Sequence, residues 1–278
     1  MLGRVGFVSV FNERYPAMST TEDFPDYART NRAHWNRHAD WWAQAGQRNW
    51  AQDKPTWGIW GTPNDAVPLL PDSLAGLDTI ELGCGTAYVS YWMLQRGARS
   101  AVGIDPSDKQ LATAQALCRK HGVEIELIHG VAESVPKPDA SFDFAISEYG
   151  AAIWADPYIW IPEARRLLQP GGRLHIFGHS PFAMTCCPHS DDGPMGYTLL
   201  QDYFGMYKIP WISAEDPSVE FNLPVSEWFR LFKQNGFVVE DFFEVQPPPD
   251  AEGEQFGTPA EWARRFPSEQ AWRLRAAD

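Results

Sequence analysis

Two glycines one residue apart, Gly83 and Gly85, lie where an apolar run ends and a helix-like pattern begins, in the stretch ELGCGTAYVS. Glycine lets the backbone approach a ligand closely, and the N-terminus of the following helix offers N–H groups that suit a carboxylate or a phosphate. A strand, a glycine-rich turn and a helix form small-ligand sites in open α/β sheets. A G-x-G pattern alone also fits an ordinary tight turn, so the stretch leaves both interpretations open.

A carboxylate ends the next apolar run, at Asp105, 20 residues after Gly85. A carboxylate there can accept hydrogen bonds from both hydroxyls of a ribose. It can equally cap a helix that begins at Pro106 or Ser107. The two roles are compatible at one position, and the spacing favours the ribose.

The loop favours a cationic ligand over a diphosphate. Dinucleotide-binding loops need a third glycine in G-x-G-x-x-G, whereas Thr86, Ala87 and Tyr88 follow Gly85 here. Glu81, on the strand before the loop, would repel a pyrophosphate but suits an ammonium group. S-adenosylmethionine (SAM) carries an ammonium, a carboxylate, a ribose and a sulfonium but no phosphate, so it fits better than NAD(P).

Strands alternate with helices from residue 77 onward, which predicts a mostly parallel sheet with right-handed crossovers. The expected strands are 77–82, 100–105, 123–130, 142–149, 172–179, 237–245 and 269–276. The expected helices are 27–46, 86–97, 106–122, 163–169 and 224–236, with Gly46 and Pro170 as stops and residues 247–260 as a loop.

Four motifs in chain order resemble the motif set of class I SAM-dependent methyltransferases, in the type 11 branch of small-molecule enzymes. They are ELGCGTA, VGIDPS, AESVP with SFDFAIS, and LLQPGGRL. The likeness is strong over residues 77–178, and NRAHWNRHAD is similar to the cap helix of bacterial members. The family's loop has a third glycine where Ala87 stands, which weakens the match without removing the site.

The resemblance implies a Rossmann-like α/β fold with a seven-stranded sheet. The expected parts are a disordered extension at 1–26, a helical and aromatic cap at 27–75, and a SAM-binding domain at 76–278 with an inserted lid at 180–223. MSTTEDFPDYA, which opens at Met18, resembles a natural protein start, so residues 1–17 are either an upstream extension or an ordinary flexible terminus.

The resemblance also implies roles for individual residues. The loop residues Glu81, Gly83, Cys84 and Gly85 pack against the methionine part of SAM. Asp105 binds the ribose, with Pro106 beside it. The adenine lies between Val131, Ala132 and Glu133, and Ser147 faces the methyl group. A surface position is the alternative for Glu133.

Methyl transfer from a sulfonium is an in-line displacement, so the protein mainly positions the nucleophile. A general base helps only where the nucleophile carries a proton. The candidates are Glu148, Tyr149, His179 and, on the cap helix, His38; each histidine also fits a packing or surface role. The fourth strand ends in SEYG and lacks the N/D-P-P-Y/F pattern of DNA adenine or glutamine amide methylation.

Aromatic residues suggest an apolar or aromatic small-molecule acceptor. The segment WGIWG, residues 57–61, either folds over cofactor or substrate or anchors the cap on the sheet. Five lid residues either line an acceptor pocket or form the lid's own small core. They are Phe182, Met184, Tyr197, Phe204 and Tyr207.

The net charge of −13 and the absence of a basic stripe disfavour nucleic acid. No apolar run approaches the roughly 20 residues that span a bilayer. Four cysteines without paired spacing fit a reducing, cytoplasmic compartment, and no metal site is expected. The alternatives are a non-catalytic SAM-binding module and an NAD(P)-dependent oxidoreductase. A protein acceptor and the oligomeric state, including a homodimer, stay open.

Overall fold

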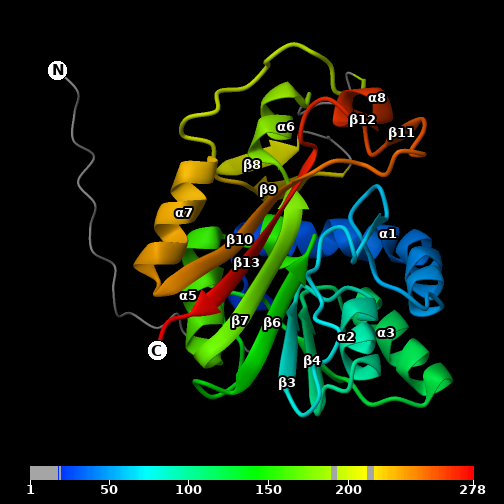
Figure 1. The fold of residues 1–278 in the computed structure, drawn as a ribbon. Coiled ribbons are helices and arrows are strands. Elements are labelled where there is room, and N and C mark those ends of the chain that lie inside the picture. Colours follow the sequence, from blue (N-terminus) through cyan, green and yellow to red (C-terminus); the bar gives the residue numbers. More distant parts are fainter. Residues whose placement is uncertain (1–17, 19, 189–192, 212–215) are drawn as a thin grey trace.

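Seven strands form one twisted sheet in the order β10-β13-β7-β6-β3-β4-β5 (Figure 1). The computed structural model describes residue 18 and residues 20–188, 193–211 and 216–278. The strands are β3 (Asp78–Leu82), β4 (Ser100–Asp105), β5 (Glu126–His129), β6 (Phe142–Glu148), β7 (Leu168–His179), β10 (Phe237–Val245) and β13 (Glu269–Ala276). β3 to β7 are parallel, and β13 runs antiparallel between β7 and β10. The predicted seven-stranded α/β sheet is confirmed.

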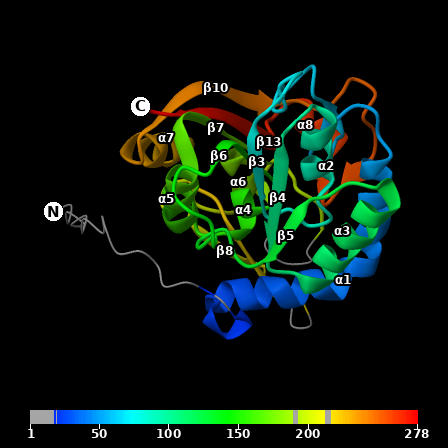
Figure 2. The same cartoon turned by 90° about the horizontal axis from the view of Figure 1, so that it is seen from below.

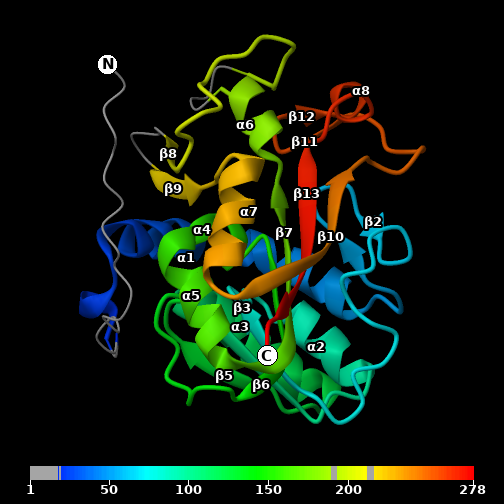
Figure 3. The ribbon, with the colours of Figure 1, turned by 60° about the vertical axis from the view of Figure 1, so that its left-hand side comes forward.

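Helices cover both faces of the sheet (Figures 1 and 3). Two of them, α2 (Tyr88–Gln95) and α3 (Asp108–His121), lie on β3, β4 and β5. The other face carries α4 (Ala151–Trp154), α5 (Pro157–Leu167) and α7 (Val225–Gln234). Apolar side chains fill both layers, with Trp92 buried on the first face and Trp160 on the second. Among the described residues, no helix combines the length and the apolar character needed to cross a membrane.

The cap helix α1 (Asp26–Trp50) crosses the end of the sheet and packs along α3 (Figure 2). The predicted stop at Gly46 is wrong, because the helix runs on to Trp50. Gly46 is instead a point of close approach, since a Cβ there would lie 2.5 Å from Oγ1 of Thr86. The backbone of α1 therefore touches the glycine loop at this position.

The disordered extension expected through residue 26 is wrong for residues 20–26. Thr21–Asp23 form a short 3₁₀ helix, η1. Phe24 is buried against Ala28 and Val131 because its ring gains more from this apolar contact than from water. Residues 1–17, on which the alternative protein start depends, lie outside the described part.

The segment between cap and sheet contains a small hairpin, β1 (Thr56–Trp57) with β2 (Thr62–Pro63). The indole of Trp57 is fully buried and donates hydrogen bonds to Asn64 Oδ1 and Val67 O at 3.2 and 3.0 Å. Trp57 also packs in one cluster with Phe144 and Phe177 of the sheet, so it anchors the aromatic segment there.

The expected lid region contains α6 (Pro181–Cys186) and the hairpin of β8 (Lys208–Trp211) and β9 (Ser218–Phe221). β9 packs on α1 and α4. The prediction that residues 247–260 are only a loop is wrong. They contain a hairpin of β11 (Glu254–Gln255) and β12 (Thr258–Pro259), and α8 (Ala260–Ala263) begins at their end. The turn-rich sequence did not predict these short strands, and Phe256 between them contacts Trp41 and Trp42 of α1.

The helix expected at 163–169 begins six residues earlier, at Pro157, and ends at Leu167. Asp156 caps it by accepting a hydrogen bond from Tyr158 N at 3.0 Å, and proline fits the first helical turn. Pro170 does not stop this helix, because β7 already begins at Leu168.

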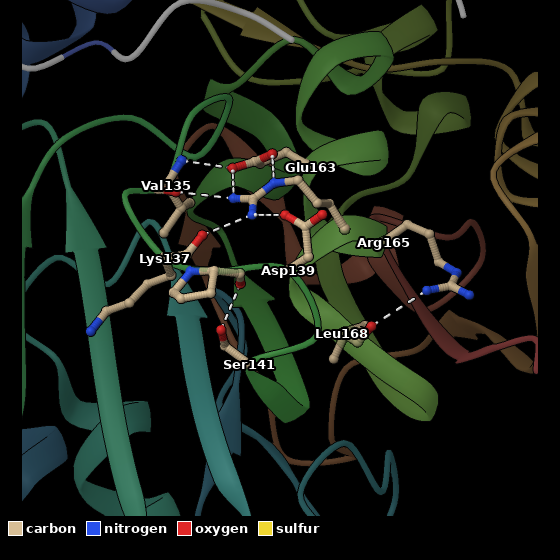
Figure 4. A network of polar contacts seen from close by, with 9 residues as sticks. Val135, Lys137, Asp139, Ser141, Glu163, Arg165 and Leu168 are labelled. Carbon is tan, nitrogen blue, oxygen red and sulfur yellow. Dashed lines mark hydrogen bonds and ion pairs between the residues drawn. The ribbon is translucent and has the colours of Figure 1, made fainter. Parts of the chain in front are cut away.

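A polar network ties α5 to the loop that follows β5 (Figure 4). Arg166 donates to both carboxylate oxygens of Glu163, to Asp139 Oδ1, and to the carbonyls of Val135 and Lys137. Glu163 Oε1 also accepts from Val135 N at 2.8 Å. The loop that carries residues 131–133 is therefore held against α5 by a charge-assisted network.

Candidate functional site

A cavity opens at the carboxyl ends of β3, β4 and β6 and is covered by α1. Open α/β sheets bind their ligands at the carboxyl ends of the strands. The predicted residues that line it are Glu81, Gly83, Cys84, Gly85, Asp105, Pro106, Val131, Ala132, Glu133, Glu148 and Tyr149. Of the predicted SAM-binding residues only Ser147 is outside this lining.

The third position of the glycine loop holds an alanine in a backbone conformation that favours glycine. Ala87 adopts φ 59° and ψ 32°, the left-handed region that glycine favours, directly before α2. Gly83 has no room for a side chain, because a Cβ would lie 2.5 Å from Ala151 N. Trp50, the last residue of α1, donates a hydrogen bond from Nε1 to Thr86 O at 2.8 Å. The loop is thus fixed between α1 and the turn after β6.

Glu81 is almost fully buried at the end of β3. Its Oε2 accepts hydrogen bonds from Ser90 N at 2.8 Å and Ser90 Oγ at 2.6 Å. Burial, with the nearby carboxylates of Glu148 and Asp105, raises the pKa of Glu81 to about 8. A cation in the cavity would favour the charged form of this carboxyl.

Asp105 ends β4 with both carboxylate oxygens on backbone amides, Gly85 N and Ser107 N, each at 2.8 Å. Burial raises the pKa of Asp105 to about 6. Ser107 is the residue that caps α3, because its hydroxyl accepts from Gln110 N at 3.2 Å. The capping alternative for Asp105 is therefore wrong. Each oxygen keeps a further lone pair for a ligand hydroxyl.

Glu133 is buried, so the alternative of a surface carboxylate is wrong. Its Oε1 accepts from the Tyr27 hydroxyl at 2.7 Å and from Asp156 N at 3.1 Å. Phe24 lies against Val131 beside this pair. The chain before and at the start of α1 therefore closes the end of the cavity where the adenine is expected.

Ser147 is fully buried and its hydroxyl is occupied. It donates to Leu82 O at 2.7 Å and accepts from Ala152 N at 2.9 Å, which joins β3, β6 and α4. The neighbouring Glu148 does line the cavity. Its carboxylate accepts from Gly58 N at 2.9 Å and from the Tyr88 hydroxyl, and burial raises its pKa.

Tyr149 lines the cavity with its backbone in the left-handed region, at φ 49°. Its hydroxyl donates to Glu269 Oε1 at 2.7 Å, and His179 Nδ1 lies 3.2 Å from the same hydroxyl. His179 is outside the cavity lining, and burial lowers its pKa to about 4. The structure places His179 behind Tyr149, in indirect contact with the cavity.

Glu269 is a polar residue of this region that the sequence patterns did not single out. It is fully buried; its Oε1 also accepts from Ile59 N at 2.8 Å, and its Oε2 has no hydrogen-bond partner within the described part of the chain. Burial, offset in part by the bonds from Tyr149 and Ile59, raises the pKa of Glu269 to about 8. The available signal was its position at the start of the last strand, which faces the end of β7.

Aromatic side chains form the remaining wall. Trp35 and Trp42 of α1 and Trp154 of α4 line the cavity, and Trp35 contacts Trp154 edge-on with ring centroids 5.2 Å apart. Phe182 and Met184 do not line it. They pack with Trp262 and its neighbours in a separate cluster, which favours the interpretation that the lid has its own small core.

Three other predicted residues also lie away from the cavity lining. Tyr197 and Phe204 are exposed, and the Tyr207 hydroxyl donates to Asp156. His38 projects from α1 to Asp216 instead of into the cavity.

Four carboxyl groups, those of Glu81, Asp105, Glu133 and Glu148, line the cavity. No lysine, arginine or histidine is among its lining residues in the described chain. Such a cavity favours ligands with positive charge and disfavours a diphosphate, which needs cationic or amide partners.

Comparisons with known proteins agree with this arrangement. A family model described as "Methyltransferase domain" matches residues 80–176. A ubiquinone biosynthesis O-methyltransferase of Rhizobium etli is 25% identical over 149 residues, which are 50% of this chain and 58% of that protein. The ubiquinone biosynthesis O-methyltransferase of Methylobacterium sp. is 30% identical over 174 residues, which are 63% of this chain and 65% of that protein. The chain thus matches less than two thirds of these relatives' length.

A solved structure of a SAM-dependent methyltransferase from Mesorhizobium loti superposes with a TM-score of 0.60 at 22% identity. It covers 78% of this chain and all of that one. This likeness shows the fold. The methyltransferase domain expected from the motif set is confirmed by the match over residues 80–176, and the similar proteins named above are all methyltransferases.

Proposed function

We propose that the protein binds SAM in the cavity under α1 and transfers its methyl group to a small-molecule acceptor. The observation that carries this proposal is the acidic lining, with Asp105 beside the glycine loop and no basic side chain among the described lining residues. SAM bears an ammonium, a sulfonium and a ribose, which suit carboxylate partners. When bound, SAM supplies the activated methyl group.

Each part of the ligand has a matching group. Asp105 would hold the ribose hydroxyls, and Glu133 with Val131 and Ala132 would border the adenine. Glu81 and the loop Gly83–Gly85 would hold the amino-acid end. Isothermal titration calorimetry tests this: SAM and S-adenosylhomocysteine should bind, and NAD should not. Tight NAD binding without SAM binding would reassign the chain to an oxidoreductase.

The acceptor we propose is an apolar or aromatic molecule that is uncharged or cationic. Trp35, Trp42 and Trp154 offer flat apolar surface, and tryptophan faces also attract cations. An anionic acceptor would enter a cavity with four carboxyl groups and no lining cation in the described chain. The named relatives are O-methyltransferases, which supports a phenolic hydroxyl as one acceptor class.

A matched panel of aromatic acceptors tests the charge rule. The panel should contain each aromatic ring in three forms, bearing a hydroxyl, an amine or a carboxylate. Release of S-adenosylhomocysteine and the mass of the methylated product should be measured. Phenols or amines should be methylated, and the carboxylates should not. Preferred turnover of the carboxylates would contradict the proposed acceptor class while leaving SAM binding intact.

Among the candidate bases, Glu148 is the group we propose to take the acceptor's proton. It lines the cavity, and its raised pKa makes its carboxylate a better proton acceptor than an ordinary glutamate. Tyr149 in the cavity wall, with His179 behind it, would help to position the acceptor. Glu148→Gln should lower kcat for a phenol by about 10²–10⁴-fold with SAM affinity within a few fold of the unmodified protein. An unchanged kcat would remove Glu148 from the reaction.

A further inference from the structure

Two imidazoles of α1 and one carboxylate converge outside the lining of the cofactor cavity. His34 and His38 are one helical turn apart, so they share a face of the helix. His34 Nδ1 lies 3.0 Å and His38 Nε2 lies 2.5 Å from the same oxygen, Oδ2 of Asp216. One donor atom from each of the three residues lies within 4.8 Å of the others.

The three side chains come from two different parts of the fold. Asp216 lies two residues before β9, the strand that packs against α1 and α4. The side chains of His34, His38 and Asp216 are 21%, 42% and 23% exposed, which leaves them open to an ion from solution but shields them in part.

We propose that His34, His38 and Asp216 bind a divalent transition-metal ion, with zinc as the representative of the class. Two imidazole nitrogens and one carboxylate oxygen form a donor set that suits zinc, iron(II), cobalt(II) and nickel(II), with water completing the coordination. A small rotation of the rings would let the ion take the place now filled by the contacts to Oδ2.

Arg37 supports this arrangement. Its guanidinium contacts Oδ1 of Asp216, and the two histidines face Oδ2. Hydrogen-bonded partners behind a metal-binding carboxylate orient it and hold it in the charged form. Arg37 would therefore be a positioning residue for Asp216.

The site lies at a junction that other contacts already define. Asn31 of α1 exchanges two hydrogen bonds with the backbone of Val219 in β9, each at 2.8 Å. The ring of His34 stacks on Trp154, with centroids 6.0 Å apart, and Trp154 lines the cofactor cavity. A bound ion would therefore strengthen the joint between the cap helix and the lid hairpin beside the cavity.

The experiment uses the full chain without an affinity tag, so that no added histidines compete. Zn²⁺ calorimetry and Co²⁺ absorbance should show one ion per chain, with ligand-field bands and no thiolate charge-transfer band. The absence of a thiolate charge-transfer band distinguishes binding at this site from binding at the cysteines. His38→Ala and Asp216→Asn should each weaken binding by at least about 10–100-fold, the range seen even for loss of supporting partners.

Asp40→Asn is the matched control, because Asp40 lies on the same helix two residues after His38 and is exposed. It should keep the affinity of the unmodified chain, and circular dichroism should confirm that all variants are folded. Zinc should also raise Tm of the unmodified chain but not of Asp216→Asn. Failure of the unmodified chain to bind one ion, or equal affinity in His38→Ala, would overturn the proposal without affecting the SAM site.

Discussion

Gly58 lies directly against the carboxyl group of Glu269: a Cβ at Gly58 would come within 2.0 Å of Oε1 of Glu269 and 2.5 Å of Phe177 Cε1. This contact places the hairpin of the aromatic segment against the ends of the interior strands β6, β7 and β13. There, Gly58 N also donates a hydrogen bond to Glu148. The WGIWG segment is therefore part of the wall that holds two buried carboxyl groups in place.

Gly58→Ala should be strongly destabilising. The new methyl group would overpack the site at a cost of about 1–3 kcal/mol, and the left-handed backbone, with φ +67°, adds about 1–2 kcal/mol. Gly61→Ala is the control, because Gly61 has nearly the same φ, +62°, and no described atom within 4 Å of an added Cβ. Urea unfolding should show Gly58→Ala to be less stable than Gly61→Ala; equal losses would contradict the packing argument.

Asp105→Asn should weaken SAM binding by about 1–3 kcal/mol, because a charged acceptor of hydrogen bonds is lost. Asp108→Asn is a matched control, because Asp108 lies three residues after Asp105, at the start of α3. Its carboxylate contacts Arg32 and Asn36 outside the cavity lining. Calorimetry should find an altered Kd only for Asp105→Asn, and an unchanged Kd there would count against the ribose role.

SAM affinity should rise with pH between about 5 and 8. The pKa of Asp105 is raised to about 6 and that of Glu81 to about 8, so each carboxyl gains its charge within this window. Since SAM is cationic, it binds the deprotonated forms better, and binding loses up to about tenfold for each pH unit below a relevant pKa. Titrations in matched buffers measure this, and Asp105→Asn should flatten the acid part of the profile. A pH-independent Kd would contradict it.

Glu269→Gln should change how stability depends on pH. The pKa of Glu269 is raised to about 8 in the folded chain, against an ordinary value of 4.5. The folded state therefore holds a proton that the unfolded state has released between these values, so the unmodified chain loses stability as pH rises from about 4.5 to 8. Glutamine stays neutral throughout.

The test is a series of thermal melts. Tm of Glu269→Gln relative to the unmodified chain should increase from pH 5 to pH 8.5, and the gain should level off above pH 8. Parallel Tm curves for the two proteins would show that Glu269 is ionised in the folded state.

The central sheet and most of the cofactor cavity could be predicted from the sequence, because both depend on local patterns. β3, β4 and β6 are short apolar runs that each carry an acidic residue at or next to the last position, and parallel strands bring those ends together. Glu81, Asp105 and Glu148 therefore meet in the cavity as the order of the motifs implied. Ala87 adopts the left-handed conformation that favours glycine, which explains why glycine is the residue expected at this position of the loop.

Other parts depend on contacts between distant segments, which a local pattern does not contain. Glu269 is 120 residues from Tyr149, and Asp216 is 178 residues from His38. The continuation of α1 past Gly46 depends on Trp50 reaching the loop at Thr86. Ser147 illustrates the opposite error: its position at a strand end is correct, but its hydroxyl is used to join β3 and α4.

β13 lies between β7 and β10, although it is the last strand in the chain. On a ribosome, β10 consequently leaves the exit tunnel with no neighbour to pair with, and the flank of β7 stays unpaired until β13 emerges. The edge of a nascent sheet invites pairing with other chains. β13 therefore joins the sheet only after both of its neighbours have been made, and a chain without β13 would have a sheet of five strands with a detached sixth.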